Sequence, residues 1–527
     1  MLVVEPPAPA PLDHRPGRAG RVRLPVVLTA IAAVVAVAAL LPLGYLVVRA
    51  LEGGWAKVAD TLFSADTGWL LVRSVGLAAA VTAACAVVGV TLAWLTVRCD
   101  LPGRRAWRVV AAVPLAVPSY VGAFAYISVF PGLTGFKGAW LVLTLLSYPL
   151  VFLPVAAALE RIDPTFEEVA RSLGDGSART FRRVTLPQLR PSIATGSLLV
   201  FLYVLSEFGA VSILRFDSFT HAIYQSYRSS FDRTPAAILG CLLLAVTFVV
   251  VVAEARTRGR AKYYAAGPGA SRPPGIVTLG RARWAALAVP VGVAALALGL
   301  PGVVLVRWLL ESVQADVDMG RVWAAAGGSL LASSLGALVT AAAAVPVALL
   351  AARHRGKVVG AIERGSYVGH ALPGIVIALS LVFFSARYLS SLYQTLPVLV
   401  FAYLVLLLPL AVSAIYTSAL QAPPALEEVA RSLGKRPMTV MRTVTAPLLA
   451  PGVAAGAALV FLACMKELPA TLLLGPTGFE TLATRLWSET SVGAYGAAAV
   501  PAAMLVVLAA VPTWILSRRL GKGRAAA

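Results

Sequence analysis

The chain has 527 residues, of which 59% are hydrophobic and 13% charged, and its mean hydropathy is +0.83. Soluble domains carry about 25% charged residues, so this composition excludes a soluble multidomain protein and predicts an integral membrane protein. The net charge of +21 is then typical of Lys and Arg on cytoplasmic loops, and we expect no nucleic-acid partner.

Twelve mostly apolar runs follow one another along the chain, each close to the 20 or so residues that a membrane-spanning helix needs. The first six are predicted at 25–48, 70–97, 109–130, 139–159, 193–214 and 236–254. The second six are predicted at 284–309, 327–352, 366–386, 396–420, 453–474 and 495–516. Pro118 and Pro373 lie inside such runs. We expect kinks there rather than breaks, because neighbouring helices can satisfy the backbone groups that proline frees.

A polar segment rich in Arg, Gly and Pro separates the two sets of runs. It has no apolar periodicity and is therefore predicted to be a linker. The predicted organisation is a cytoplasmic tail (1–24), a first half (25–255), a cytoplasmic linker (256–283), a second half (284–517) and a second cytoplasmic tail (518–527). The predicted fold class is an all-α membrane protein.

The two halves share sequence. EEVARSLG occurs at Glu167–Gly174 and again at Glu427–Gly434, a shift of 260 residues. The same shift pairs Pro187 with Pro447, Glu207 with Glu467 and Ser74 with Ser334, whereas Pro118 and Pro373 are 255 residues apart. A duplicated six-helix unit explains these matches. Because each unit has an even number of spans, the two repeats are predicted to be parallel and to present both EEVARSLG segments to one membrane face.

Each EEVARSLG segment lies in the longest polar loop of its half, at 160–192 or 421–452. Glu167 and Glu168 occupy the first turn of a short helix, where carboxylates favour the helix dipole. Gly174 ends this helix because glycine tolerates the left-handed closing conformation. A second short helix is predicted from about Ser177. Two near-identical hairpins between diverged helices predict two equal binding surfaces for one kind of partner.

The hairpin sequence resembles the EAA loop of binding-protein-dependent ABC importer permeases. The resemblance rests on Glu168, Ala170 and Gly174, followed by Val184, Leu186 and Pro187, and on the matching Glu428, Ala430, Gly434, Val444 and Pro447. Val169 and Val429 replace a common Ala, and Ala446 replaces a common Leu. The resemblance covers both halves.

The resemblance implies a permease subunit of the bacterial inner membrane, with both termini cytoplasmic. Its hairpins would dock on two copies of a cytoplasmic ABC ATPase, and an extracytoplasmic binding protein would deliver the solute. The permease would be no enzyme and would bind no cofactor, since ATP and Mg belong to the ATPase, and we find no phosphate-binding G-x-x-x-x-G-K-[ST] loop. The predicted coupling residues are Glu167, Glu168, Ala170, Leu173, Gly174, Pro187, Glu427, Glu428, Ala430, Leu433, Gly434 and Pro447.

The solute is predicted to be ferric iron, because residues 101–104, 113–126 and 206–234 resemble the ferric iron permeases. Thiamine or another small solute is the alternative. Hard cations prefer oxygen ligands, but no metal-ligand set is assigned. Tyr203, Tyr224 and Tyr227 are expected to belong to the translocation path or an outer gate.

Glu207 and Glu467 lie about fourteen residues into their predicted spans, roughly 21 Å along a helix. Carboxylates inside a membrane usually face a protein interior or a pore. Their matched positions place them near the central axis, where they would line the path or the outer gate. A structural ion pair between Lys466 and Glu467 is the alternative.

A proton-coupled secondary transporter with two six-helix halves is the competing class. Asp100–Arg105, between the second and third predicted spans, faintly resembles the loop that such carriers have at this position. Such a carrier, however, does not need duplicated hairpins between its fourth and fifth spans. Lys and Arg concentrate in the loops on the hairpin side, and this bias predicts that the hairpins are cytoplasmic.

Overall fold

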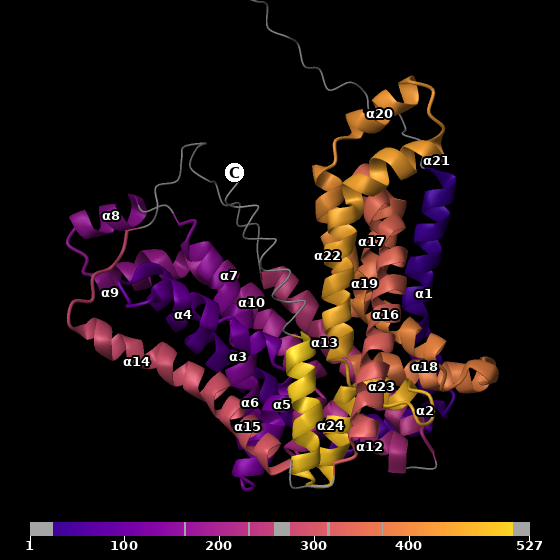
Figure 1. Cartoon of the computed structure of the whole chain (residues 1–527), viewed down its shortest axis with the longest axis horizontal. Helices are drawn as coiled ribbons and strands as arrows, with labels where there is room; N and C mark the ends of the chain where they lie inside the picture. The colour runs from indigo at the N-terminus through magenta and orange to yellow at the C-terminus, as the bar shows by residue number, and fades with distance from the viewer. Residues whose placement is uncertain are drawn as a thin grey trace, which may run out of the picture.

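A computed structural model of the chain describes residues 25–162, 165–229, 232–257, 275–312, 317–371 and 373–509. Within these ranges the chain is helical apart from its loops and one isolated bridge between Cys99 and Val277. Figure 1 shows two groups of long helices that diverge toward the ends carrying α8 (Thr165–Ser172) and α20 (Pro424–Ser432). We call this end of the molecule the hairpin face and the other end the opposite face.

Among the described residues, nine helices are long and apolar enough to cross a membrane. In the first half they are α1 (Val26–Leu51), α3 (Ala65–Arg98), α6 with α7 (Gly135–Leu159), η2 with α10 (Phe181–Ser206) and α13 (Thr234–Thr257). In the second half they are α14 with α15 (Ala282–Ser312), α16 (Met319–Arg353), α19 (Leu396–Gln421) and α21 with α22 (Pro437–Met465). The chain is therefore an all-α, multi-pass membrane protein.

The third predicted run is broken, so the expectation of a kink at Pro118 was wrong. Arg104–Ala116, which contains α4 (Arg104–Val110) and η1 (Val113–Ala116), meets α5 (Ser119–Val129) at 90°. Val117 is extended, with φ −77° and ψ 123°, because a proline disfavours helix in the residue before it, and Pro118 itself is extended, with φ −61° and ψ 139°. Pro373 is extended in the same way before α18 (Gly374–Tyr388), which follows α17 (Lys357–Tyr367) and η4 (Val368–Ala371).

The described helices give nine candidate spans, or ten if the bent pair counts as one. Two further apolar helices, Gly374–Tyr388 and Tyr495–Ala509, are shorter. The last predicted run continues to residue 516, beyond the described residues. The linker prediction at 256–283 also falls largely outside them, at 258–274. The prediction of twelve spans therefore remains a prediction.

The fifth span of each half begins earlier than predicted and stops at or just before the paired glutamate. In the first half α10 (Leu186–Ser206) ends immediately before Glu207, and in the second half α22 (Ala446–Met465) ends two residues before Glu467. The prediction that these carboxylates lie within a continuous helix was wrong. Short helices follow both breaks: α11 (Gly209–Ile213) and α12 (Phe219–Ser229) in the first half, α23 (Pro469–Leu474) and α24 (Leu482–Ser491) in the second.

Side-chain contacts correct the predicted register of the repeat. Ser74 on α3 accepts a hydrogen bond from the N–H of Phe219, which starts α12. Ser329 on α16 accepts one from the N–H of Leu482, which starts α24. Ser74 therefore corresponds to Ser329, and its predicted pairing with Ser334 was wrong. The shift between matched residues is 255 through the second and third spans. It becomes 260 further along because the second half contains extra residues around η5 (Ser390–Leu392).

Small residues bring the central helices of the first half into close contact. α3, α7 (Pro149–Leu159) and α10 pack together, as do α16, α19 and α22 in the second half. A Cβ on Gly196 would lie 2.7 Å from the carbonyl oxygen of Leu150, and one on Gly89 would lie 2.9 Å from the amide nitrogen of Phe152. These glycines allow the close backbone approach that is typical of helix packing in membranes.

Candidate functional site: two matched hairpins and a cavity between the halves

Each EEVARSLG segment folds as the predicted hairpin of two short helices. In the first half α8 is followed by α9 (Ser177–Thr180) and a π-helical turn, η2 (Phe181–Thr185), that leads into α10. In the second half α20 is followed by α21 (Pro437–Val440) and the matching π-helical turn η6 (Met441–Thr445). Pro187 and Pro447 lie in the first turn of α10 and α22, where a proline is tolerated.

Glycine ends the first helix of both hairpins, as predicted. Gly174 has φ +88° and Gly434 has φ +75°, in the left-handed region that favours glycine. The N–H groups of Asp175 and Lys435 donate to the carbonyls of Ala170 and Ala430, five residues back. This bond is typical of a Schellman ending and satisfies carbonyls that the helix end leaves free.

An apolar stripe is exposed on the first helix of both hairpins. Phe166, Val169 and Leu173 are 56%, 53% and 82% exposed. Their counterparts Leu426, Val429 and Leu433 are 47%, 56% and 73% exposed. Spacings of three and four residues place each set along one helix face. Matched apolar stripes of this kind mark a binding surface more readily than a solvated loop. Glu168 and Glu428 are exposed on the same helices.

The first glutamate of each motif points inward instead. The Glu167 carboxylate is buried, pairs with Arg98 at the end of α3, and accepts a hydrogen bond of 2.8 Å from the Thr185 hydroxyl. In the second half Glu427 pairs with Arg353 at 2.9 Å and accepts a bond of 3.0 Å from Thr445.

Sequence reasoning grouped these glutamates with the coupling surface and missed Arg98 and Arg353. The two arginines lie far upstream of the hairpins, and the only sequence signal for them was their own spacing of 255 residues, which equals that of Pro118 and Pro373.

A cavity of about 420 Å³ lies between the halves, and both Glu207 and Glu467 line it. Tyr120, Tyr203 and Lys466 also line it. So do Ser119 and Gly374, each of which directly follows the proline at the break in its third span. The structure thus brings together the two glutamates that the repeat had paired.

Each of these glutamates accepts hydrogen bonds from the start of the short helix that follows it. Glu207 Oε1 accepts from the Ala210 N–H at 3.0 Å and from the Ser119 hydroxyl at 2.8 Å. Glu467 accepts from the N–H groups of Ala470, at 3.0 and 3.1 Å, and of Thr471, at 3.2 Å. Carboxylates are good partners for free N–H groups at a helix start. Each carboxylate therefore supplies the hydrogen-bond acceptor that the N–H groups after the helix break need, and those N–H groups supply the donors that the carboxylate needs.

The two glutamates differ in one partner. Gly374 occupies the position equivalent to Ser119 and supplies no hydroxyl; a Cβ there would lie 2.9 Å from Glu467 Oε1. The predicted alternative, a Lys466–Glu467 ion pair, is absent from the ion pairs of the described residues. Lys466 contributes its backbone carbonyl, which accepts a hydrogen bond of 3.4 Å from Tyr120.

Aromatic side chains beside the cavity join the halves through α12 and α24, which lie toward the opposite face (Figure 1). The rings of Phe208, Tyr224 and Trp487 have centroids 5.0 to 6.1 Å apart. The Trp487 indole N–H donates to the Ser212 hydroxyl at 3.3 Å. We call Phe208, Tyr224 and Trp487 the aromatic cluster. Phe208 and Trp487 are the members that sequence reasoning missed.

The three predicted tyrosines have separate locations. Tyr203 lines the cavity and Tyr224 belongs to the aromatic cluster. Tyr227 lies farther along α12, where its ring packs against Phe383 of the second half with centroids 6.2 Å apart.

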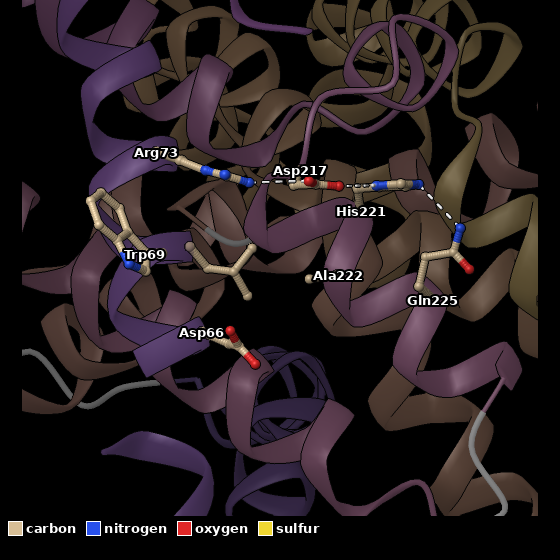
Figure 2. Close-up of a pocket in the computed structure, with 8 residues that line it drawn as sticks. Asp66, Trp69, Arg73, Asp217, His221, Ala222 and Gln225 are labelled. Atoms are coloured by element: carbon tan, nitrogen blue, oxygen red, sulfur yellow. Dashed lines mark hydrogen bonds and ion pairs between the residues drawn. The ribbon is translucent and has the colours of Figure 1, made fainter. Parts of the chain in front are cut away.

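A second, open cavity of about 680 Å³ lies on the opposite face between the start of α3 and α12. Figure 2 shows Arg73, Asp217 and His221 in a row, with Arg73 Nη1 3.1 Å from Asp217 and His221 Nε2 3.3 Å from Gln225. Burial lowers the pKa of His221, and the nearby Asp217 only partly opposes this effect. Among the described residues no group of three or more His, Cys, Asp or Glu side chains is arranged to hold a metal ion.

Comparison with known proteins agrees with the repeat. Residues 86–260 and 344–520 each match the binding-protein-dependent transport system inner membrane component. The Fe(3+)-transport system permease protein of Haemophilus influenzae is 38% identical over 499 residues, 94% of this chain and 99% of the relative.

Other relatives match over less of the chain. A sulfate transport system permease protein of Salmonella typhimurium is 32% identical over 190 residues, 33% of this chain and 68% of the relative. A molybdenum transport system permease protein of Escherichia coli is 35% identical over 139 residues, 23% of this chain and 60% of the relative. The chain belongs to the family of binding-protein-dependent transport system inner membrane components, and it carries the family's domain twice.

Proposed function

We propose that the chain is the permease subunit of an ATP-driven importer that carries ferric iron across the bacterial inner membrane. One observation carries the choice of solute: the identity to an iron permease extends over both halves and 99% of that relative. The matches to sulfate and molybdenum permeases cover a third of this chain or less, so they support the family more than a solute. Thiamine or another small solute is the alternative.

In this proposal each half contributes six spans, arranged as parallel repeats. The broken third run of the first half and the shorter helices Gly374–Tyr388 and Tyr495–Ala509 supply the spans beyond the nine long ones. Both termini and the hairpin face are then cytoplasmic, because Lys and Arg concentrate in the loops of that side.

Two copies of a cytoplasmic ABC ATPase dock on the exposed apolar stripes and hydrolyse ATP, while this chain holds no cofactor. Two equal stripes on one chain support two equal docking sites. A secondary transporter would have no use for such a pair.

The helices diverge at the hairpin face (Figure 1), whereas the aromatic cluster joins the halves toward the opposite face. This arrangement corresponds to an inward-facing state. ATP binding draws the hairpins together and separates the aromatic cluster, so that a binding protein on the outer face releases its solute into the cavity. Glu207, Glu467 and Tyr203 then line the path, and Tyr224 belongs to the outer gate with Phe208 and Trp487. Tyr227 lies beside that gate.

Uptake into vesicles tests this function. The purified chain, its ATPase and its binding protein are reconstituted, and uptake of radiolabelled ferric iron is measured with ATP inside. We expect uptake that requires ATP and binding protein and ignores a proton gradient, with labelled thiamine and sulfate as control solutes. Uptake driven by a proton gradient without the ATPase would contradict the class, and uptake of a control solute in place of iron would contradict the solute.

A further inference from the structure

Two matched polar clusters connect each hairpin to the membrane helices beside it. The first anchor is Arg98, Glu167 and Thr185, and the second anchor is Arg353, Glu427 and Thr445. We propose that these anchors are positioning elements that transmit movement of the docked hairpins to the spans. The proposal rests on the proposed function, because it concerns how the ATPase and the path are coupled.

Each anchor joins three segments that are separate in the sequence. The arginine is the last residue of a second span, α3 or α16. The glutamate lies on the first hairpin helix, and the threonine ends the π-helical turn before the fifth span. The same three residue types meet in both halves, although the surrounding helices have diverged. Insertions of this π-helical kind are frequent at functional sites.

The geometry of the first anchor opposes independent movement of its parts. One carboxylate oxygen of Glu167 pairs with Arg98 and the other accepts the hydrogen bond from Thr185. A carboxylate held at both oxygens cannot rotate without losing a partner. The side chains of Arg98 and Glu167 are only 2% and 6% exposed, so water cannot replace a lost partner and the ion pair is weakly screened. The hairpin, second span and fifth span are therefore expected to move as one body.

The second anchor is looser. Its arginine and glutamate side chains are both 15% exposed, and the two hydrogen bonds converge on a single oxygen of Glu427. The other oxygen lies 3.7 Å from Arg431 of its own helix.

The end of the linker reinforces only the first anchor among the described residues. Val277 N–H donates to the Arg98 carbonyl at 2.7 Å, and the Arg98 guanidinium donates to the Gly275 carbonyl at 3.3 Å. Leu279 N–H donates to the carboxylate of Asp100 at 2.7 Å. The two hairpins are thus held with unequal stiffness.

The test separates docking from transmission. Variants E167Q and E427Q remove the charge of each anchor but keep the size of the side chain, and T445V removes only a hydroxyl. The matched control is E160Q: Glu160 forms an exposed ion pair of 2.5 Å with Arg108, and its side chain is 48% exposed. Each variant is purified with its ATPase subunit, and ATP hydrolysis, transport per ATP and a distance at the opposite face are measured.

Spin labels at S229C and S491C report that distance. Both serines are exposed, near the ends of α12 and α24, and their hydroxyls bond only within their own helices. In the unsubstituted complex, ATP with vanadate should lengthen the distance between the labels. In E427Q and E167Q we expect retained ATPase subunit and hydrolysis within about twofold, but a reduced lengthening and about tenfold less transport per ATP. T445V should show the same defect in weaker form, and E160Q should match the unsubstituted complex.

The double variant R353E/E427R exchanges the partners of the second anchor and should restore part of the coupling that E427Q loses. Unchanged transport per ATP in E167Q, E427Q and T445V would overturn the proposal. Loss of the ATPase subunit from E427Q would also overturn it, since the glutamate would then act in docking. If the unsubstituted complex retains no ATPase or shows no ATP-dependent distance change, the proposed function fails instead.

Discussion

At the scale of single residues, the unusual feature is a pair of glutamates placed at helix breaks, of which Glu207 is buried and Glu467 is partly buried. Glu207 and Glu467 cap the short helices that follow them, and both line one cavity. A carboxylate that is hydrogen-bonded in this way is tolerated away from water, whereas an unpaired one would be costly. Their position gives the proposed path two carboxyl groups, one from each half.

The double variant E207Q/E467Q tests this role. Glutamine keeps the shape and an accepting oxygen for the N–H groups of Ala210 and Ala470, so the fold should persist, while the cavity loses both carboxyl groups. We expect ferric iron uptake to fall about tenfold, equivalent to about 1.4 kcal/mol, with normal ATPase binding. The measurement is initial uptake rate in vesicles, and S128A on the nearby α5 is the control. An unchanged rate in the double variant would remove both glutamates from the path.

The difference between the halves at this site is also testable. Ser119→Ala removes the hydroxyl that donates to Glu207, and loss of a hydrogen bond to a charged group costs about 1.5–3 kcal/mol. Thermal unfolding of the purified protein should show this destabilisation. Glycine at position 374 already lacks that donor in the second half, so G374A should act by crowding Glu467 Oε1 instead. Equal stability of Ser119→Ala and the unsubstituted protein would show that the hydrogen bond adds nothing.

At the scale of elements, the hairpin depends on a glycine with a left-handed backbone. A Cβ on Gly174 or Gly434 would meet nothing within 4 Å, so a substitution there acts through backbone strain alone. For a residue other than glycine this strain costs about 1–2 kcal/mol. G174A and G434A should therefore misplace the apolar stripe and reduce the ATPase that co-purifies with the chain.

Gly176 offers a matched control within the first hairpin. It also has open space around a Cβ, but it lacks the positive φ of Gly174. G176A should therefore retain the ATPase as the unsubstituted chain does. If G176A and G174A lose the ATPase equally, backbone conformation is not the cause.

The sequence was informative where structure is local. The hairpin helices, with Glu167 in the first turn and Gly174 at the end, follow from capping and turn chemistry that act within a few residues. The breaks before Ser119 and after Ser206 were not predicted. Glu207 accepts one hydrogen bond from Ala210, three positions away, but the bond that joins the two breaks comes from Ser119, 88 positions away. The apolar pattern cannot distinguish a continuous span from one interrupted in this manner.

The anchors were missed for the same physical reason. Arg98 and Glu167 are 69 positions apart, and nothing near either residue indicates the other. The repeat contained a usable signal, since Arg353 follows Arg98 at the shift of Pro373 from Pro118. This signal was missed because the 260-residue shift, which holds from the hairpins onward, was also applied to the second span. There it paired Ser74 with Ser334 instead of Ser329.

At the scale of the whole molecule, one chain supplies both sides of the cavity and both hairpins. Two groups of helices separate toward the hairpin face and meet toward the opposite face (Figure 1), and each group includes a helix of the other half, since α1 packs on α16 and α15 packs on α5. Trp487 of the second half packs on Phe208 and Tyr224 of the first. In the proposed function this chain replaces a dimer of permeases. One copy of the chain should therefore be sufficient for a complete importer.

The mass of the intact complex tests this central claim most directly. The chain is purified together with its ATPase subunit in detergent, and native mass spectrometry counts the copies of each. The account predicts one copy of the 54.8 kDa chain with two ATPase subunits. A complex with two copies of the chain for two ATPase subunits, or a chain that transports its solute with no ATPase bound, would contradict it.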